Sequence, residues 1–300
     1  MAEIIGTSGN DTLNGTSDDD DILSLEGDDL INIIAPNLGF DAIDGGNGTD
    51  TLRLDYSSLD TSVSSFFAFN RVYYFGNSTF GYYNTTASNI EQFDVTGGTD
   101  NDTLLGLAGN DTLNGSAGDD YIDAGSGNDT VAGGLGDDLI YGYDGNDILR
   151  GDLSNRSPGG FIGGNDTIYG GSGNDQIGGK AGNDELYGDE GNDKIWGDNG
   201  DDLLWGSLGN DTLVGDDFSG GQGSDTFVLA TDEGTDTISD FQLSRDLLGL
   251  AGTLTFGQLA IAQAGNDTRI SVNDQTLAIL SGVEATALTD SFFTPITVVG

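Results

Sequence analysis

The chain has 300 residues, of which 51 are Asp or Glu and only 8 are Lys or Arg, so its formal net charge is −43. It contains no histidine and no cysteine, which excludes Ser-His-Asp triads, His-ligated zinc, disulfides and thiolate nucleophiles. The charge also excludes nucleic acid as a partner, because one polyanion repels another. Since 35% of the residues are hydrophobic, as in globular proteins, we expect a hard divalent cation to neutralise the carboxylates in place.

The N-terminal residues contain neither a basic region nor an apolar stretch, so no signal peptide of the Sec type is recognised. Residues 247–266 form an uncharged run, but Gly, Thr and Gln interrupt it at close intervals. We interpret this run as strands and turns and expect no transmembrane segment.

A nonapeptide of the form G-x-x-G-N-D-x-apolar-x recurs along the chain. Its first copies cover residues 6–32, and a truncated unit and a full unit follow at 39–53. Uninterrupted blocks of six units cover 97–150 and 161–214, with a variant unit at 220–228 and a half-unit at 234–239. In all 19 units position 6 is Asp and position 8 is apolar, so the repeat determines the fold.

Each repeated position has a physical role. Glycine at position 4 permits a positive φ or a close backbone approach in a tight turn. The apolar residue at position 8 points inward from a three-residue strand, and two nonapeptides make one 18-residue coil. Stacked coils pair their strands in parallel, with a right-handed connection. The sequence therefore predicts an all-β fold, a right-handed parallel β-roll (solenoid).

Stacking places the position-6 Asp of one unit next to that of the unit two repeats later. Unneutralised columns of carboxylates would force the coils apart, whereas Ca²⁺ accepts Asp oxygens and loop carbonyls as ligands. Magnesium fits less well, because it demands octahedral geometry and retains its waters. The predicted ligands are Asp11, Asp20, Asp29, Asp102, Asp111, Asp120, Asp129, Asp138, Asp147, Asp166, Asp175, Asp184, Asp193, Asp202, Asp211 and Asp225.

Some position-6 residues are less regular. We leave Asp41 and Asp50 out of the ligand set because the register breaks beside them. Asp18 and Asp100 replace the glycine of their turns, so we expect weaker binding in those two units. Counting units that face each other in unbroken register predicts nine calcium ions, or eleven if the roll continues across an insertion at 151–160. Folding should then depend on calcium.

These units resemble the repeats-in-toxin (RTX, hemolysin-type) family of calcium-binding proteins, whose repeat is G-G-x-G-x-D-x-apolar-x. The resemblance implies a β-roll with calcium between turns two repeats apart. Residues 236–241 resemble the D-x-apolar-x-D-F segment that closes the roll in serralysin-type C-terminal regions, although Ser244 stands where that family usually has Gly. The resemblance also implies type I secretion and a secreted, extracellular or cell-surface protein.

The predicted organisation has four parts: N-terminal roll repeats at 1–53, an aromatic-rich β insertion at 54–96, the main calcium-binding roll at 97–241, and a C-terminal capping and secretion region at 242–300. The aromatics of the insertion are interpreted as packing on the roll or, alternatively, as a platform for cell-surface polysaccharide. A hairpin is expected within 269–280, around Asn273 and Asp274.

Three functional classes fit these features. The first, which we favour, is a secreted, non-catalytic calcium-binding protein with a structural, surface or adhesive role. The others are the exported C-terminal part of an RTX toxin or enzyme, and a calcium-dependent polysaccharide-active enzyme. Met1 leads us to expect a complete product rather than a tail, and eight basic residues leave few candidates for a catalytic base.

Overall fold

The computed structural model describes residues 2–34, 39–68, 71–78, 81–152, 163–216 and 223–296. The chain forms two compact units, Met1–Tyr143 and Asp144–Gly300, which are described separately below as unit 1 and unit 2. Both consist of β-strands, and unit 2 adds three short 3₁₀ helices, η1 (Phe256–Gln258), η2 (Ala285–Ala287) and η3 (Asp290–Phe292). Within the described ranges, no helix has the length and apolar character needed to cross a membrane.

The repeat forms strands as expected, because each strand begins at or beside the position-6 Asp and buries the apolar residue two positions later. In β13 (Tyr121–Asp123), for example, Ile122 is fully buried while its two neighbours are half-buried. One inward side chain per strand makes a thin core in each unit. Its members are at most 1% exposed: Ile22, Ile31, Leu52, Leu104, Leu113, Ile122, Val131, Ile140, Leu149, Ile168, Ile177, Leu186, Ile195, Leu204, Leu213, Phe227 and Ile238.

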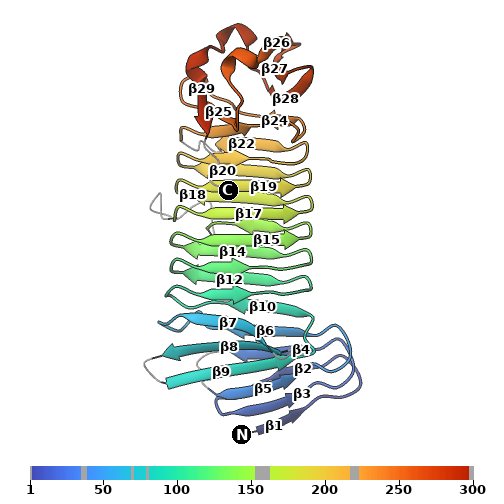
Figure 1. Cartoon of the computed structure of the whole chain (residues 1–300). Coiled ribbons are helices and arrows are strands. Elements are labelled where there is room, and N and C mark those ends of the chain that lie inside the picture. The colour runs from blue at the N-terminus through green and yellow to red at the C-terminus, as the bar shows by residue number, and fades with distance from the viewer. Residues whose placement is uncertain are drawn as a thin grey trace. The chain divides into compact units, whose positions relative to one another are not determined.

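Unit 1 contains two sheets (Figure 1). The first has the order β1 (Ala2–Ile5), β3 (Asp20–Leu23), β5 (Phe40–Asp44), β9 (Gly81–Ser88), β8 (Arg71–Ser78), β7 (Val63–Ala68), β11 (Thr103–Leu105), β13 and β15 (Leu139–Asp144). The second has the order β2 (Thr12–Asn14), β4 (Leu30–Ile34), β6 (Thr51–Asp55), β10 (Gln92–Thr96), β12 (Thr112–Ala117) and β14 (Thr130–Leu135). Neighbouring strands are parallel except around β8.

Unit 2 also contains two sheets. One has the order β17 (Thr167–Ser172), β19 (Glu185–Glu190), β21 (Leu203–Trp205), β23 (Thr226–Leu229), β25 (Leu247–Ala251) and β29 (Phe293–Ile296). The other has the order β16 (Ile148–Arg150), β18 (Gln176–Ala181), β20 (Lys194–Asn199), β22 (Thr212–Asp216), β24 (Asp236–Ile238), β28 (Gln275–Leu280), β27 (Asp267–Val272) and β26 (Ala260–Ala264). The first sheet is parallel throughout. Each unit is therefore a β-roll, which confirms the predicted fold class.

The insertion of unit 1 adds more strands to one sheet than to the other. Strands β7, β8 and β9 lie between β5 and β11, whereas the opposite sheet gains only β10. Tyr74 of β8 is fully buried, its ring lies 6.0 Å from that of Phe93, and its hydroxyl donates to the carbonyl of Leu105 at 3.1 Å. This aromatic residue packs the insertion onto the roll. Phe69 and Phe80 lie outside the described residues.

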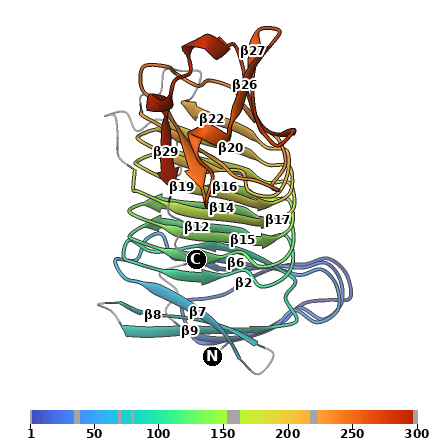
Figure 2. The same ribbon diagram turned by 45° about the horizontal axis from the view of Figure 1, so that its top comes forward.

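The expected hairpin is present in unit 2 as β27 and β28, which pair in antiparallel fashion (Figure 1). Strand β26 pairs with the other side of β27, also in antiparallel fashion (Figure 2). Asn273 and Asp274 form its two-residue turn with φ of 47° and 68°, the left-handed values that such a turn requires. Strand β28 pairs with β24 and β29 pairs with β25, so this region covers the last repeat strand of each sheet. Pro295 lies in the edge strand β29, where it limits further strand pairing.

Candidate metal centre

The position-6 Asp residues of successive coils are linked by hydrogen bonds along both edges of each unit. The backbone N–H of one Asp donates to Oδ1 of the Asp in the next coil, for instance from Asp184 to Asp202 at 2.9 Å and from Asp193 to Asp211 at 2.8 Å. This bond fixes the direction of each carboxylate. It places the side chain in the space between two turns, as the stacking of the repeats predicts.

These hydrogen bonds define four columns that together contain every predicted ligand. In unit 1 one edge has Asp11–Asp29–Asp50 and Asp111–Asp129, and the other has Asp20–Asp41 and Asp102–Asp120–Asp138. In unit 2 one edge has Asp147–Asp175–Asp193–Asp211–Asp236, and the other has Asp166–Asp184–Asp202–Asp225–Asp246. All are buried except Asp11, which is half-buried.

The second carboxylate oxygen of many column residues is buried without a hydrogen bond. Within the described part of the chain, this holds for Oδ2 of Asp29, Asp50, Asp111, Asp120, Asp175, Asp184, Asp193, Asp202, Asp211 and Asp225. A buried carboxylate oxygen without a partner is costly, so native proteins rarely retain one. Ten such atoms aimed at the turns indicate cation sites, and a hard oxygen donor of this kind fits Ca²⁺.

Three predicted ligands differ, because their own turns satisfy the second oxygen. Oδ2 of Asp11 accepts from the backbone N–H of Thr7, and Oδ2 of Asp20 accepts from that of Thr16. In Asp102 the same oxygen accepts from the N–H of Gly98 at 2.7 Å. We expect weaker calcium binding at these positions, since the ion must displace an existing hydrogen bond.

Burial raises the pKa of several column carboxyls, including Asp111, Asp184 and Asp225, above the ordinary 3.8. The pKa of Asp184 is raised to about 9, mainly by desolvation, with smaller contributions from the neighbouring charges of Asp202 and Asp166. The same cause raises the pKa of Asp111 and Asp225 to about 8. In the absence of a cation these groups therefore hold protons near neutral pH, and a bound Ca²⁺ would take the place of those protons.

Glycine at positions 1 and 4 makes room for this arrangement. A Cβ on Gly191, at position 4, would lie 1.3 Å from the carbonyl oxygen of Gly173 in the preceding coil, and its φ is +148°. A Cβ on Gly179, at position 1, would lie 2.1 Å from Oδ2 of Asp184. Glycine at position 1 thus keeps open the space beside the unpaired oxygen. The predicted need for glycine at position 4 is confirmed.

Position 2 of the turn was not recognised from the sequence as conformationally special. Non-glycine residues adopt a positive φ there, including Lys180 at 88°, Asp189 at 67° and Asp198 at 74°. Gly, Asp and Ser are frequent at this position, and this preference is the sequence signal for a positive φ. Lys180 and Asp198 are paired at 2.7 Å and nearly buried, so position 2 also carries a charge pair beside one column.

The structure adds four residues to the columns. Asp41 and Asp50, which are absent from the predicted ligand set, are 3% and 0% exposed and accept the N–H of Asp20 and Asp29 at 3.0 and 2.9 Å. Asp236 and Asp246 continue the two columns of unit 2 beyond the regular repeats.

The insertion near residue 151 begins later than the sequence suggested. A Cβ on Gly151 would lie 1.9 Å from Oδ2 of Asp166, which is the position-1 geometry seen at Gly179. Gly151 and Asp152 therefore belong to the turn that ends at Asp166. Paired residues of β16 and β18 are 28 positions apart instead of 18, so the roll accommodates ten extra residues at this coil without losing register.

The columns of unit 1 are interrupted at the aromatic-rich insertion. The N–H of Asp50 donates to Oε2 of Glu91, but the N–H that donates to Asp111 belongs to Phe93, two residues later. On the other edge, the residue paired with Asp41 is Thr85, and the N–H that donates to Asp102 belongs to Val63. The insertion thus places two apolar side chains and a threonine at levels where the repeats place Asp.

The described residues contain no group of three or more acidic side chains that would hold a metal alone. Each level of a column supplies one carboxylate from each of two coils, so the remaining oxygens of a calcium site must come from turn carbonyls. This is the mixed ligand set that the repeat predicts.

A family model described as the RTX calcium-binding nonapeptide repeat (4 copies) matches residues 3–31, 96–131, 124–156, 163–186 and 178–213. Over these ranges the chain contains RTX repeats. RTX repeats bind Ca²⁺, and the matched ranges contain every predicted ligand except Asp225. The resemblance of the C-terminal region to serralysins lies beyond the matched residues and stays a prediction.

The solved structures that are similar to this chain include two bacterial proteins. One is the extracellular lipase LipA of Serratia marcescens, at 18% identity and a TM-score of 0.26, covering 97% of this chain and 39% of the lipase. The other is the AlgE6R3 subunit of the mannuronan C5-epimerase of Azotobacter vinelandii, at 28% identity and a TM-score of 0.23, covering 43% of this chain and 77% of that subunit. The chain thus spans about two fifths of the lipase. No curated protein sequence matches.

Proposed function

We propose that this protein is a secreted calcium-binding module that folds when Ca²⁺ fills its turns and that serves a structural, surface or adhesive role without catalysis. The observation that carries the proposal is the set of buried, unpaired Oδ2 atoms along the columns. Calcium bound to these oxygen atoms would satisfy them and so stabilise the roll. RTX proteins are typically secreted, and extracellular calcium suits sites with Kd of roughly 10⁻⁴–10⁻³ M.

The proposed sites are the sixteen predicted Asp residues, which hold about nine to eleven ions if each ion lies between facing turns. Asp41, Asp50, Asp236 and Asp246 are further candidates, because each accepts the same backbone hydrogen bond as the predicted ligands. We retain the four-part organisation at 1–53, 54–96, 97–241 and 242–300 as part of this proposal.

The free energy of binding about nine calcium ions would determine whether the chain folds. A site at ten times its Kd adds roughly 1.4 kcal/mol to the free energy of unfolding, so nine sites add about 13 kcal/mol. The total stability of an ordinary domain is about 5–15 kcal/mol. The calcium-free chain should therefore be largely unfolded at neutral pH.

Circular dichroism during a calcium titration tests this proposal. We expect a coil-like spectrum in chelator and a cooperative gain of β signal as calcium is added, with magnesium at equal concentration giving much less. Isothermal titration calorimetry of the same samples then counts the ions. A full β spectrum in excess chelator at neutral pH would refute calcium-dependent folding.

The catalytic alternatives need a different test. A calcium-dependent polysaccharide enzyme would require a basic side chain beside an ion, and two of the eight basic residues, Arg53 and Lys180, are already paired with Asp94 and Asp198. A screen of polysaccharide and lipid substrates, with and without calcium, distinguishes catalysis from binding. Turnover of any of them would replace our proposal with an enzymatic one.

A further inference from the structure

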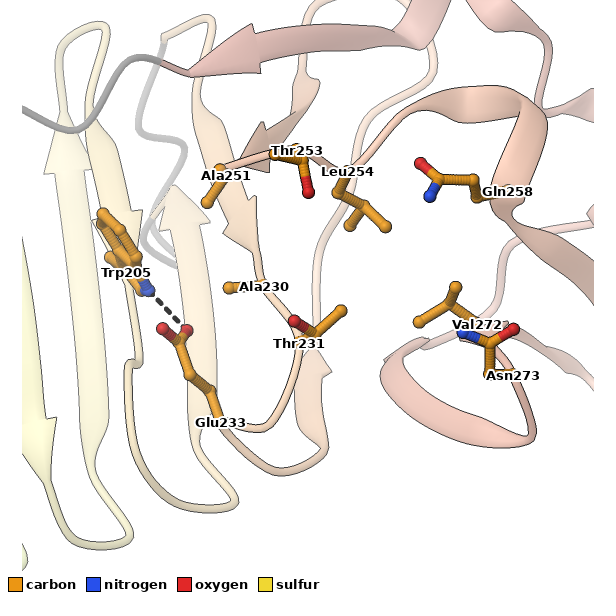
Figure 3. A pocket seen from close by; sticks show the side chains of 11 residues that line it. Trp205, Ala230, Thr231, Glu233, Ala251, Thr253, Leu254, Gln258, Val272 and Asn273 are labelled. Carbon is orange, nitrogen blue, oxygen red and sulfur yellow. Dashed lines mark hydrogen bonds between the residues drawn. The ribbon is translucent and has the colours of Figure 1, made fainter.

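Unit 2 contains a cavity of about 460 Å³ that the calcium columns do not use (Figure 3). Trp205, at the end of β21, and Glu233 form one wall. The opposite side comes from the chain around η1 and from the turn of the β27–β28 hairpin. The cavity therefore lies where the last regular repeats meet the C-terminal region of the same unit.

The two side chains of this wall are hydrogen-bonded to each other. The indole Nε1 of Trp205 donates to Oε2 of Glu233 at 2.8 Å, as the dashed line in Figure 3 shows. Both side chains are half-buried. Within the described residues, the carboxylate oxygen Oε1 of Glu233 receives no hydrogen bond, so it is available to a ligand hydroxyl.

Trp205 is also the last ring of an aromatic row on the outer face of the sheet. Parallel pairing aligns Tyr169, Tyr187 and Trp205 on β17, β19 and β21. The rings of Tyr169 and Tyr187 are stacked at 4.8 Å and 9°, and those of Tyr187 and Trp205 lie 6.2 Å apart. All three are half-buried, so the row offers a continuous aromatic strip that leads to the cavity.

The rest of the cavity combines an apolar floor with a polar rim. Ala251, Leu254 and Val272 are buried and form the floor. Gln258 and Asn273 are exposed at the rim. Oε1 of Gln258 already accepts from the backbone N–H and hydroxyl of Thr255, which leaves its amide nitrogen as a donor.

From these contacts we infer that the cavity is a binding site for a neutral, hydroxyl-rich glycan. A pyranose ring has an apolar face that stacks on an indole and a rim of hydroxyls that pair with carboxylate and amide groups. The net charge of −43 disfavours uronates, phosphates and other anions at this site. The inference goes beyond calcium binding, because none of the lining residues belongs to a column.

Tryptophan fluorescence tests the inference in the full-length, calcium-loaded protein. The chain has two tryptophans, so Trp196→Phe leaves Trp205 as the only one. We expect neutral oligosaccharides (cello-, xylo- or malto-hexaose) to change its emission saturably. Oligogalacturonate and choline serve as the anionic and cationic probes and should leave the emission unchanged.

Calorimetry on variants distinguishes glycan binding in the cavity from binding on the aromatic row and from an effect on folding. Trp205→Ala should weaken glycan binding at least tenfold, and so should Thr253→Trp, which fills the cavity from an exposed position but retains Trp205. The matched control Trp196→Ala, on β20 of the opposite sheet, should bind as the unmodified protein does. Each variant must show the calcium-dependent dichroism of the unmodified protein before it is compared.

Three outcomes overturn the inference: no response to any neutral glycan, equal affinity in Thr253→Trp and the unmodified protein, or a response to choline alone. The second outcome would place the glycan on the aromatic row outside the cavity, and the third would identify a site for organic cations. Calcium-dependent folding is measured independently, so failure here leaves the calcium proposal intact.

Discussion

Replacing Asp184 with Asn should have opposite effects on stability with and without calcium. Asp184 is 1% exposed, its Oδ2 has no hydrogen bond, and burial raises the pKa of its carboxyl from 3.8 to about 9. A carboxyl whose pKa is higher in the folded state stabilises the fold most below pH 3.8. This contribution is lost progressively as the pH rises toward 9.

The magnitude at pH 7 follows from the distance to the unfolded pKa. At about 1.4 kcal/mol per pH unit, protonating Asp184 during folding costs about 4 kcal/mol at pH 7 in the absence of calcium. The asparagine side chain of the variant carries no charge and avoids this cost. Its buried amide N–H groups, however, destabilise the fold by about 1–3 kcal/mol if they find no hydrogen-bond acceptor. We therefore expect Asp184→Asn to stabilise the calcium-free fold by about 1–3 kcal/mol. In saturating calcium it should be destabilising, because Asp184 is part of the turns shared with Asp166 and Asp202.

Two dichroism experiments measure the two signs. In chelator at pH 7, trimethylamine N-oxide drives folding, and its midpoint should fall in Asp184→Asn. In excess calcium, the thermal midpoint of the same variant should fall instead. Asp201→Asn is the matched control, because Asp201 is exposed one position before the column residue Asp202, and it should change neither midpoint appreciably. A variant that is destabilised equally in chelator and in calcium would refute the reasoning, since Asp184 would then have a packing role alone.

Three further predictions concern pH, glycine and the unequal sites. In chelator, acidification from pH 8 to pH 5 should increase the β signal in circular dichroism, because the raised pKa values of Asp111, Asp175 and Asp225 favour the folded state as protons bind; a flat profile would contradict this. Gly191→Ala should cost at least about 3 kcal/mol, since its Cβ would overlap the carbonyl of Gly173, whereas Gly257→Ala meets no atom within 4 Å and should be nearly neutral in thermal unfolding. Calorimetry should show a smaller loss of calcium binding in Asp102→Asn than in Asp193→Asn, because Oδ2 of Asp102 already has a hydrogen bond; equal losses would show that this bond is irrelevant.

The regular part of the fold could be predicted because the residues of each repeat determine its local geometry. Asp at position 6 and an apolar residue at position 8 determine where a strand begins and which side chain it buries, so Asp184 and Leu186 could be placed from the sequence alone. The Oδ1 hydrogen bonds between coils then follow from stacking at a spacing of 18 residues.

The columns were harder to predict where the spacing changes. Asp20 and Asp41 are 21 residues apart and Asp211 and Asp236 are 25 apart, so a search in fixed register misses both pairs. Backbone pairing of the strands restores the alignment, and the extra residues lie between the strands. The spacing of the repeat alone does not predict which lengths a turn accommodates.

Side-chain contacts between the repeats and the C-terminal region could not be predicted, although the β27–β28 hairpin within that region could. Trp205 and Glu233 are 28 residues apart, and no periodic pattern relates them. The left-handed conformation of Lys180 follows from the shape of the turn and not from any preference of lysine. Such contacts depend on how the C-terminal region packs on the repeats of unit 2.

The interruption of the columns in unit 1 has a consequence for cooperativity. Neighbouring ions influence one another when they share a carboxylate, and Val63, Thr85 and Phe93 provide none at the levels they occupy. On one edge Thr85 and Val63 therefore separate the carboxylates of the N-terminal repeats from those of residues 97–143, whereas on the other edge the Glu91 carboxylate still accepts the N–H of Asp50. We therefore expect calcium to bind unit 1 in separate cooperative blocks on the two sides of this interruption.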